Sequence, residues 1–117
     1  MEKNKNDIKI LRGMVEISEL KKEVKRFRDE RDWKKYHTQK NLALSVSIEA
    51  AELLELFQWK EEESDEVSID RLEEEMADVM IYLLALAERA EIDLGEAVLE
   101  KLERNRKKYP AEEEHFS

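Results

Sequence analysis

The stretch SIEAAELLELFQW, residues 47–59, decides the fold of this 117-residue chain. Apolar residues fill most of it, glycine and proline are absent, and Ala, Leu and Glu all favour helix. Its only charges are three glutamates, Glu49, Glu52 and Glu55, and no lysine or arginine occurs in residues 41–59. A helix that is apolar nearly all round is expected at the centre of a helical bundle, where its acids need an explanation.

The rest of the chain is predicted to be helical as well. Only two glycines and one proline interrupt it, too few for a fold made of strands and turns. We therefore predict an all-α fold with one compact domain over residues 16–110, a flexible arm at 1–15 and a frayed tail at 111–117. The predicted helices cover about 17–32 with Ser18 as N-cap, Thr38 or Lys40 to Gln58, about 69–91 with Ser68 as N-cap, and Asp93, the cap, to about Lys108.

Charge and composition narrow the partners. The net charge of −9 repels a phosphate backbone, so the sequence disfavours a nucleic-acid polymer as partner, although a bound cation can still bring small phosphorylated ligands to an acidic site. The longest uncharged apolar run, 79–87, is too short to span a bilayer, and the first residues lack the apolar core of a secretory signal. With no cysteine present, a cytoplasmic protein without a membrane partner is expected.

Acidic residues on two predicted helices are spaced so that they can meet. Glu49 and Glu52 are three residues apart, as are Glu75 and Asp78, so each pair lies on one helical face. A short connection joins the two helices, which are expected to pack antiparallel and bring the four carboxylates together. Four like charges in a poorly hydrated place need protons or a cation, and such oxygen ligands suit Mg²⁺ or Mn²⁺.

Two other interpretations of these acids stay open. In a chain with thirty acidic residues, such spacings also arise by chance on a solvated helix face. A di-iron carboxylate site is a further alternative, but its Glu-x-x-His spacing occurs here only at Glu112 and His115, in the predicted tail. Because Asp78 stands alone in the apolar run 76–87, and bases are missing from 41–59, the context favours a magnesium-type site.

The ordered motifs resemble those of one family. EAAE at 49–52, followed after 22 residues by EMAD at 75–78, matches the ExxE…ExxD signature of the MazG-like, all-α nucleoside triphosphate pyrophosphohydrolases. Further segments, over about residues 17–110, look like the dCTP pyrophosphatase branch of that family: FRDERDW at 27–33, ELFQW at 55–59, IYL at 81–83 and NRKKYP at 105–110. Val24 departs from the pattern, because eukaryotic dCTP-cleaving members have a histidine there, which leaves the choice of base open.

The resemblance implies a four-helix unit, assembled as a homodimer or homotetramer, that hydrolyses a nucleoside triphosphate to the monophosphate and pyrophosphate. The implied substrate is a dCTP-like or modified pyrimidine nucleotide, and the implied role is nucleotide-pool sanitation. The implied Mg²⁺ ligands are Glu49, Glu52, Glu75 and Asp78, with Glu49 or Glu52 also acting as general base.

The resemblance also implies substrate contacts: Trp33, Trp59 and Tyr82 near the base and sugar, His37 as the match to a family histidine with no assigned role, and Lys101, Arg104, Asn105 and Lys108 near the phosphates. Packing of the aromatic residues in a core or dimer, a surface or capping role for His37, and plain surface charge for the basic residues are the competing interpretations. For the whole protein, the alternatives are a non-catalytic nucleotide-binding or helical assembly module and a related all-α dUTPase-type phosphohydrolase.

Overall fold

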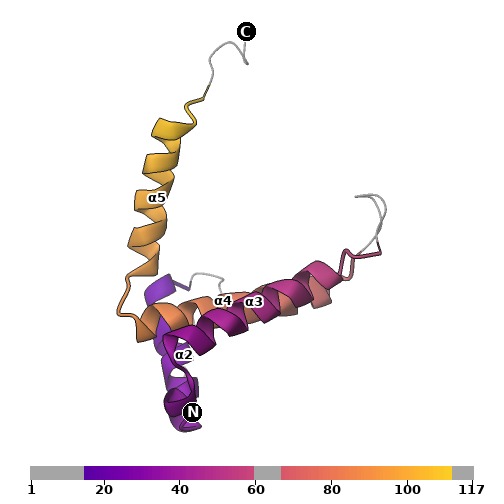
Figure 1. Ribbon diagram of the computed structural model, residues 1–117, viewed down its shortest axis with the longest axis vertical. Coiled ribbons are helices and arrows are strands. Elements are labelled where there is room, and N and C mark those ends of the chain that lie inside the picture. Colours follow the sequence, from indigo (N-terminus) through magenta and orange to yellow (C-terminus); the bar gives the residue numbers. More distant parts are fainter. Residues whose placement is uncertain (1–14, 60–66, 112–117) are drawn as a thin grey trace.

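A computed structural model describes residues 15–59 and 67–111 of the chain. In that part the protein is all-helical, with four α-helices and one short 3₁₀ helix, which confirms the predicted fold class (Figure 1). The elements are α2 (Ile17–Glu30), η1 (Lys34–Tyr36), α3 (Gln39–Glu55), α4 (Ile69–Arg89) and α5 (Leu94–Lys108). The predicted arm and tail, including Glu112 and His115, lie outside the described residues apart from Val15 and Ala111.

The starts of three helices follow the capping signals in the sequence. The side chains of Thr38, Ser68 and Asp93 each accept a hydrogen bond from a backbone amide three residues further on, at 3.1, 3.4 and 3.0 Å. The predicted cap Ser18 is wrong, because α2 already begins at Ile17. Its N-cap is Glu16, which has extended backbone and makes no side-chain capping bond, so this helix starts without the local signal that the prediction used.

The turn between α4 and α5 fixes the direction of the last helix. The amide of Ile92 donates to the carbonyl of Ala87 at 2.8 Å, and the amide of Glu91 donates to that of Glu88 at 3.2 Å. These two bonds, with Glu91 in the left-handed region at φ 57°, form a Schellman motif. Since Asp93 caps α5 two residues later, little backbone freedom remains between the two helices.

The helices α3 and α4 lie side by side and antiparallel, α2 packs across α4, and α5 points away from all three (Figure 1). Within the described residues the buried apolar side chains come from α3, the turn after it and α4: Leu42, Leu56, Leu84, Ala85 and Ala87. The radius of gyration of 17.9 Å exceeds the about 13 Å of a compact 100-residue domain, because α5 projects away from the other helices.

The prediction that the helix from Thr38 or Lys40 to Gln58 lies at the centre of a bundle is wrong for the single chain. Leu44, Ile48 and Leu54 on α3 are 52, 59 and 68% exposed, and Met76 on α4 is 56% exposed. The physical reason is that α5 projects outward, so that one face of the α3–α4 pair has no helix of its own chain against it (Figure 1). Among the described residues, no helix combines the length and apolar composition that crossing a membrane requires.

Candidate metal centre and adjoining pocket

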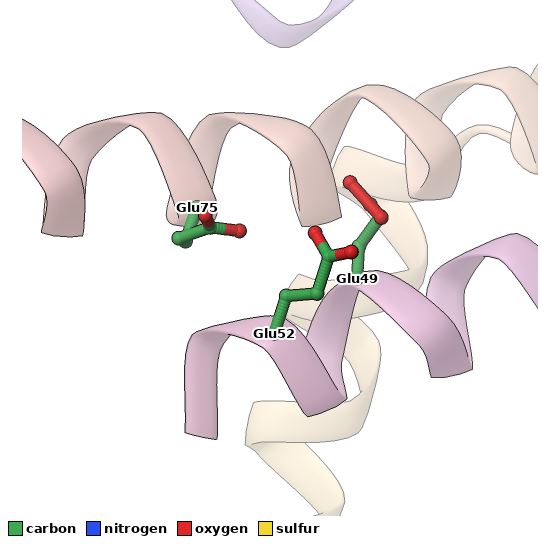
Figure 2. Close-up of side chains that lie close together, drawn as sticks. All are labelled: Glu49, Glu52 and Glu75. Carbon is green, nitrogen blue, oxygen red and sulfur yellow. The ribbon is translucent and has the colours of Figure 1, made fainter. Parts of the chain in front are cut away.

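Three of the four predicted ligands meet between α3 and α4. Glu49 and Glu52 are one turn apart on α3, Glu75 faces them from α4, and all three carboxylates point into the space between the helices (Figure 2). One oxygen of each lies within 4.8 Å of the others. The spacing of three residues places the first two side by side, and the antiparallel packing of the helices brings in the third.

Negative charge dominates the electrostatics of this carboxylate cluster. Burial raises the pKa of Glu49, and the neighbouring charges of Glu52 and Asp78 raise it further. Burial also raises the pKa of Glu75, again with Glu52 and Asp78 adding to the effect. The Oε2 atom of Glu75 is buried without a hydrogen-bond partner in the described part of the chain. A cation placed among these oxygens would relieve both the repulsion and the missing contact.

Asp78, the fourth predicted ligand, lies at the edge of the cluster. Its side chain is outside the group whose oxygens lie within 4.8 Å of one another, yet its charge reaches both Glu49 and Glu75. It also lines a neighbouring pocket of about 180 Å³. Asp78 therefore connects the carboxylate cluster with the pocket.

The pocket beside Asp78 is largely aromatic. Its lining residues come from α2, α4 and the segment between α2 and α3: Phe27, Arg28, Trp33, His37, Asp78, Ile81, Tyr82 and Ala85. The ring of His37 lies 5.9 Å from that of Trp33 and 6.5 Å from that of Tyr82, both edge to face. Three of the predicted substrate contacts, Trp33, His37 and Tyr82, thus surround one cavity, and Tyr82 shares it with Asp78 as their spacing on one helical face predicts.

The other predicted substrate contacts lie elsewhere. Trp59, beyond the end of α3, is 84% exposed. The basic residues and the asparagine of the predicted phosphate contacts are all on α5, which leads away from the α3–α4 pair (Figure 1): Lys101, Arg104, Asn105 and Lys108. A single chain thus joins the carboxylate cluster to the aromatic pocket and leaves α5 apart from both.

Comparison with known proteins agrees with this arrangement. Residues 44–117 match the MazG-like family. The chain belongs to the MazG-like family. It is 47% identical over 90 residues to dCTP pyrophosphatase 1 of Bos taurus and 47% identical over 91 residues to dCTP pyrophosphatase 1 of Homo sapiens. The predicted resemblance to the dCTP pyrophosphatase branch is therefore confirmed.

The extent of the similarity differs between relatives. The two alignments cover 72 and 73% of this MazG-like chain but only 53 and 54% of the relatives, so the chain spans about half the length of the curated relatives that it matches. A crystal structure of a pyrophosphatase from Archaeoglobus fulgidus is similar over its whole length. It has a TM-score of 0.73 and 43% identity, with 95% of this chain and 99% of that chain covered.

Arg28, which lines the pocket, and Glu88, which pairs with it, are not among the predicted site residues. Arg28 on α2 is 4% exposed, the one buried charged side chain in the described residues, and it bonds both His37 and Glu88. Glu88 is sixty residues away on α4. The sequence signal is weak, because Arg28 sits in a segment rich in both charges, where each arginine resembles its exposed neighbours.

The segment between α2 and α3 turns sharply before the pocket. Asp32 has a positive φ of 54°, a conformation that aspartate tolerates better than most residues. The amide of Trp33 then donates to the carbonyl of Arg28 at 3.0 Å, and η1 leads on to His37. This turn brings Trp33 and His37 back over the end of α2, where both line the pocket.

Proposed function

We propose that this MazG-like chain hydrolyses a nucleoside triphosphate, preferably a dCTP-like or modified pyrimidine deoxynucleotide, to the monophosphate and pyrophosphate. The observation that carries the proposal is the carboxylate cluster of Glu49, Glu52 and Glu75 within 4.8 Å, next to an aromatic pocket. Relatives named dCTP pyrophosphatase 1, which this chain resembles over about half of their length, support it. Such an activity would serve nucleotide-pool sanitation, and we place it in the cytoplasm.

The residues of the cluster fit a divalent cation with a preference for oxygen ligands. Three carboxylates converge, one of their buried oxygens has no partner among the described residues, and the pKa values of Glu49 and Glu75 are raised mainly by burial. Oxygen-only ligands favour Mg²⁺ or Mn²⁺ over Zn²⁺. We propose Glu49, Glu52, Glu75 and Asp78 as the ligands of Mg²⁺, which when bound would neutralise the triphosphate oxygens and acidify a water molecule.

Different residues of the chain would activate the attacking water and bind the base. Glu49 or Glu52 would accept a proton from the water that attacks the α-phosphorus, because both carboxylates lie in the cluster proposed to hold the metal. The bond from the α-phosphorus to its bridging oxygen breaks, and pyrophosphate leaves. Trp33 and Tyr82 would border the base and sugar, with His37 beside them, and Trp59 would stack on the exposed face of the base.

We further propose that the active form is a homodimer or a homotetramer. The apolar side chains of α3 and α4 that face no helix of their own chain continue on α5, where Leu99 is 64% exposed and Leu102 is 44% exposed. A second copy covering these faces would remove that apolar surface from water. It would also bring Lys101, Arg104, Asn105 and Lys108 of one chain to the carboxylate cluster of the other, where they would bind the phosphates.

Pyrophosphate release from each NTP and dNTP, with Mg²⁺ and with chelator, tests the activity. We expect turnover that requires the metal and a reduction by at least ~10²-fold in Glu52→Gln with unchanged helicity. No release from any nucleotide by the wild type would favour a non-catalytic nucleotide-binding module. Preference for dUTP, with release of pyrophosphate, would favour a dUTPase-type enzyme.

Mixing two inactive variants tests the shared site. Glu52→Gln lacks an acid of the cluster, and Lys101→Ala lacks a proposed phosphate contact. If α5 serves the partner's cluster, a hybrid dimer of the two variants contains one intact site, and activity returns after the subunits are exchanged. If each site is built by one chain, the mixture stays as inactive as its components.

A further inference from the structure

Arg28 joins His37 of the pocket wall and Glu88 on α4 in one hydrogen-bonded network. Its Nε donates to Nδ1 of His37 at 2.9 Å, and its Nη1 donates to Oε2 of Glu88 at 3.3 Å. The side chain of Glu88 is 21% exposed, so this ion pair is largely shielded from solvent. The third nitrogen, Nη2, is buried and has no hydrogen-bond partner in the described residues.

The network determines which nitrogen of His37 carries a proton. An arginine Nε–H is only a donor, so the Nδ1 atom that receives it must be unprotonated. Burial lowers the pKa of His37, and the charge of Arg28 lowers it further, which keeps the ring neutral near pH 7. A neutral imidazole with Nδ1 unprotonated carries its hydrogen on Nε2.

The free edge of the imidazole is therefore a hydrogen-bond donor. Nε2 of His37 makes no hydrogen bond with another described residue. His37 and Arg28 both line the 180 Å³ pocket, as does Asp78 at the edge of the carboxylate cluster. This wall of the pocket thus offers one unused N–H group, at Nε2 of His37, while Nη2 of Arg28 is buried.

We infer that Arg28 is a positioning residue: it holds His37 as the neutral Nε2–H tautomer, so that the pocket receives the acceptor edge of a nucleobase. This inference rests on the proposed function for the identity of the ligand, while the tautomer follows from the network alone. The Nε2–H donor of His37 matches the unprotonated ring nitrogen that cytosine offers as an acceptor. Uracil and thymine present a proton at that ring nitrogen, which opposes a donor.

Nitrogen-15 NMR of the histidine side chains tests the tautomer without any substrate. The chain has two histidines, so His115→Gln leaves the signals of His37 alone. We expect an unprotonated Nδ1 and a protonated Nε2 in the wild type, and averaged signals from exchanging tautomers once the donor is lost. The variant is Arg28→Met combined with Glu88→Gln, because Arg28→Met alone would leave the shielded carboxylate of Glu88 without its cation.

Two further variants make this NMR test specific. Arg28→Lys keeps a charge and a donor and should restore the wild-type pattern, even if the double variant folds poorly. Lys25→Met, which breaks an exposed ion pair with Asp29 on the same helix, should leave His37 unchanged. A wild-type His37 with Nδ1 protonated, or a double variant with the wild-type pattern, overturns the inference.

Steady-state kinetics with dCTP and dUTP test whether His37 recognises the hydrogen-bond acceptor edge of the base. His37→Phe should raise KM for dCTP about tenfold, the loss of one buried hydrogen bond, with kcat changed less. KM for dUTP should change little. His37→Gln, whose amide can donate near the position of Nε2, should keep most of the affinity for dCTP, and Arg28→Met with Glu88→Gln should behave like His37→Phe.

The outcomes separate this inference from the proposed function. Equal changes of KM for dCTP and dUTP, or a loss of kcat alone, mean that His37 supports the fold rather than the base, and the acceptor edge is refuted. If the wild type cleaves no nucleotide, the proposed function fails. Equilibrium titration with dCTP and dUTP then decides the acceptor edge, and the NMR pattern still decides the role of Arg28.

Discussion

Replacing Glu49 by glutamine should make the metal-free protein more stable and the metal-loaded protein less stable. The oxygens of Glu49 and Glu52 lie within 4.8 Å of each other. Two unit charges at that distance repel by about 0.9 kcal/mol even at the permittivity of water. Because Glu52 is exposed, this lower limit is the appropriate value, and the charge of Glu75 acts in the same direction.

The expected size of the effect follows from these charges. Relief of about 1 kcal/mol raises the melting temperature of a domain of this size by about 4 °C. If Mg²⁺ binds only the folded chain, as proposed, a hundredfold excess over its Kd should stabilise the wild type by about 2.7 kcal/mol. Glu49→Gln lacks one charged ligand and should gain much less. The order of stability of the two proteins therefore reverses between chelator and Mg²⁺.

Thermal melts of both proteins, at one protein concentration and with either chelator or a Mg²⁺ series, measure this reversal. The matched control is Glu55→Gln, which removes an exposed acid from the same helix outside the carboxylate cluster. It should melt like the wild type in every condition. If Glu49→Gln also follows the wild type, or gains stability equally with and without Mg²⁺, the three glutamates do not form a convergent cation site.

Three further predictions concern pH, the base and the backbone. In chelator, the difference in melting temperature between Glu49→Gln and the wild type should grow as pH rises above the ordinary glutamate pKa of 4.5. The folded state raises the pKa of Glu49, so the wild type loses stability between the unfolded and the folded pKa of this residue, whereas glutamine does not titrate. Thermal melts over a pH series measure this difference. Trp59→Ala should raise KM for the preferred nucleotide about tenfold, a stacking loss of ~1–3 kcal/mol, while Mn²⁺ titration shows unchanged metal affinity. Glu91→Gly should raise the free energy of unfolding by up to about 1 kcal/mol in denaturant, because the left-handed backbone at Glu91 is strained for any residue with a Cβ atom. Glu91→Ala keeps the Cβ atom and should give no such gain.

Local sequence signals predict the parts of this structure that depend on near neighbours. Thr38, Ser68 and Asp93 cap their helices because each side chain needs only an amide three residues away. Glu49 and Glu52 meet because helical geometry alone places them on one face. Predicting that Glu75 joins them required a further assumption, that two helices joined by a short connection pack antiparallel. The structure confirms that assumption.

Contacts over long sequence separations were not predictable in the same way. Arg28 and Glu88 are sixty residues apart and meet only because α2 packs across α4. In the sequence, Arg28 has the same charged neighbours as the exposed Arg26 and Arg31, so composition gives no sign of its burial. A buried arginine is determined by tertiary packing, and the state of His37 depends on it.

The apolar pattern of α3 shows a different limit. An apolar helix face predicts that something covers it, but it does not say whether the cover comes from the same chain. Here the cover is not expected from the same chain, because several hydrogen bonds hold α5 in its outward direction. They are the Schellman bonds at Glu91 and Ile92, the capping bond of Asp93, and the bond that Lys21 Nζ donates to the carbonyl of Ile92 at 3.2 Å. To fold α5 back over α3, the chain would have to break these bonds. A second copy could cover the face while these bonds stay intact, and in the proposed dimer its α5 would bring basic residues to the carboxylate cluster.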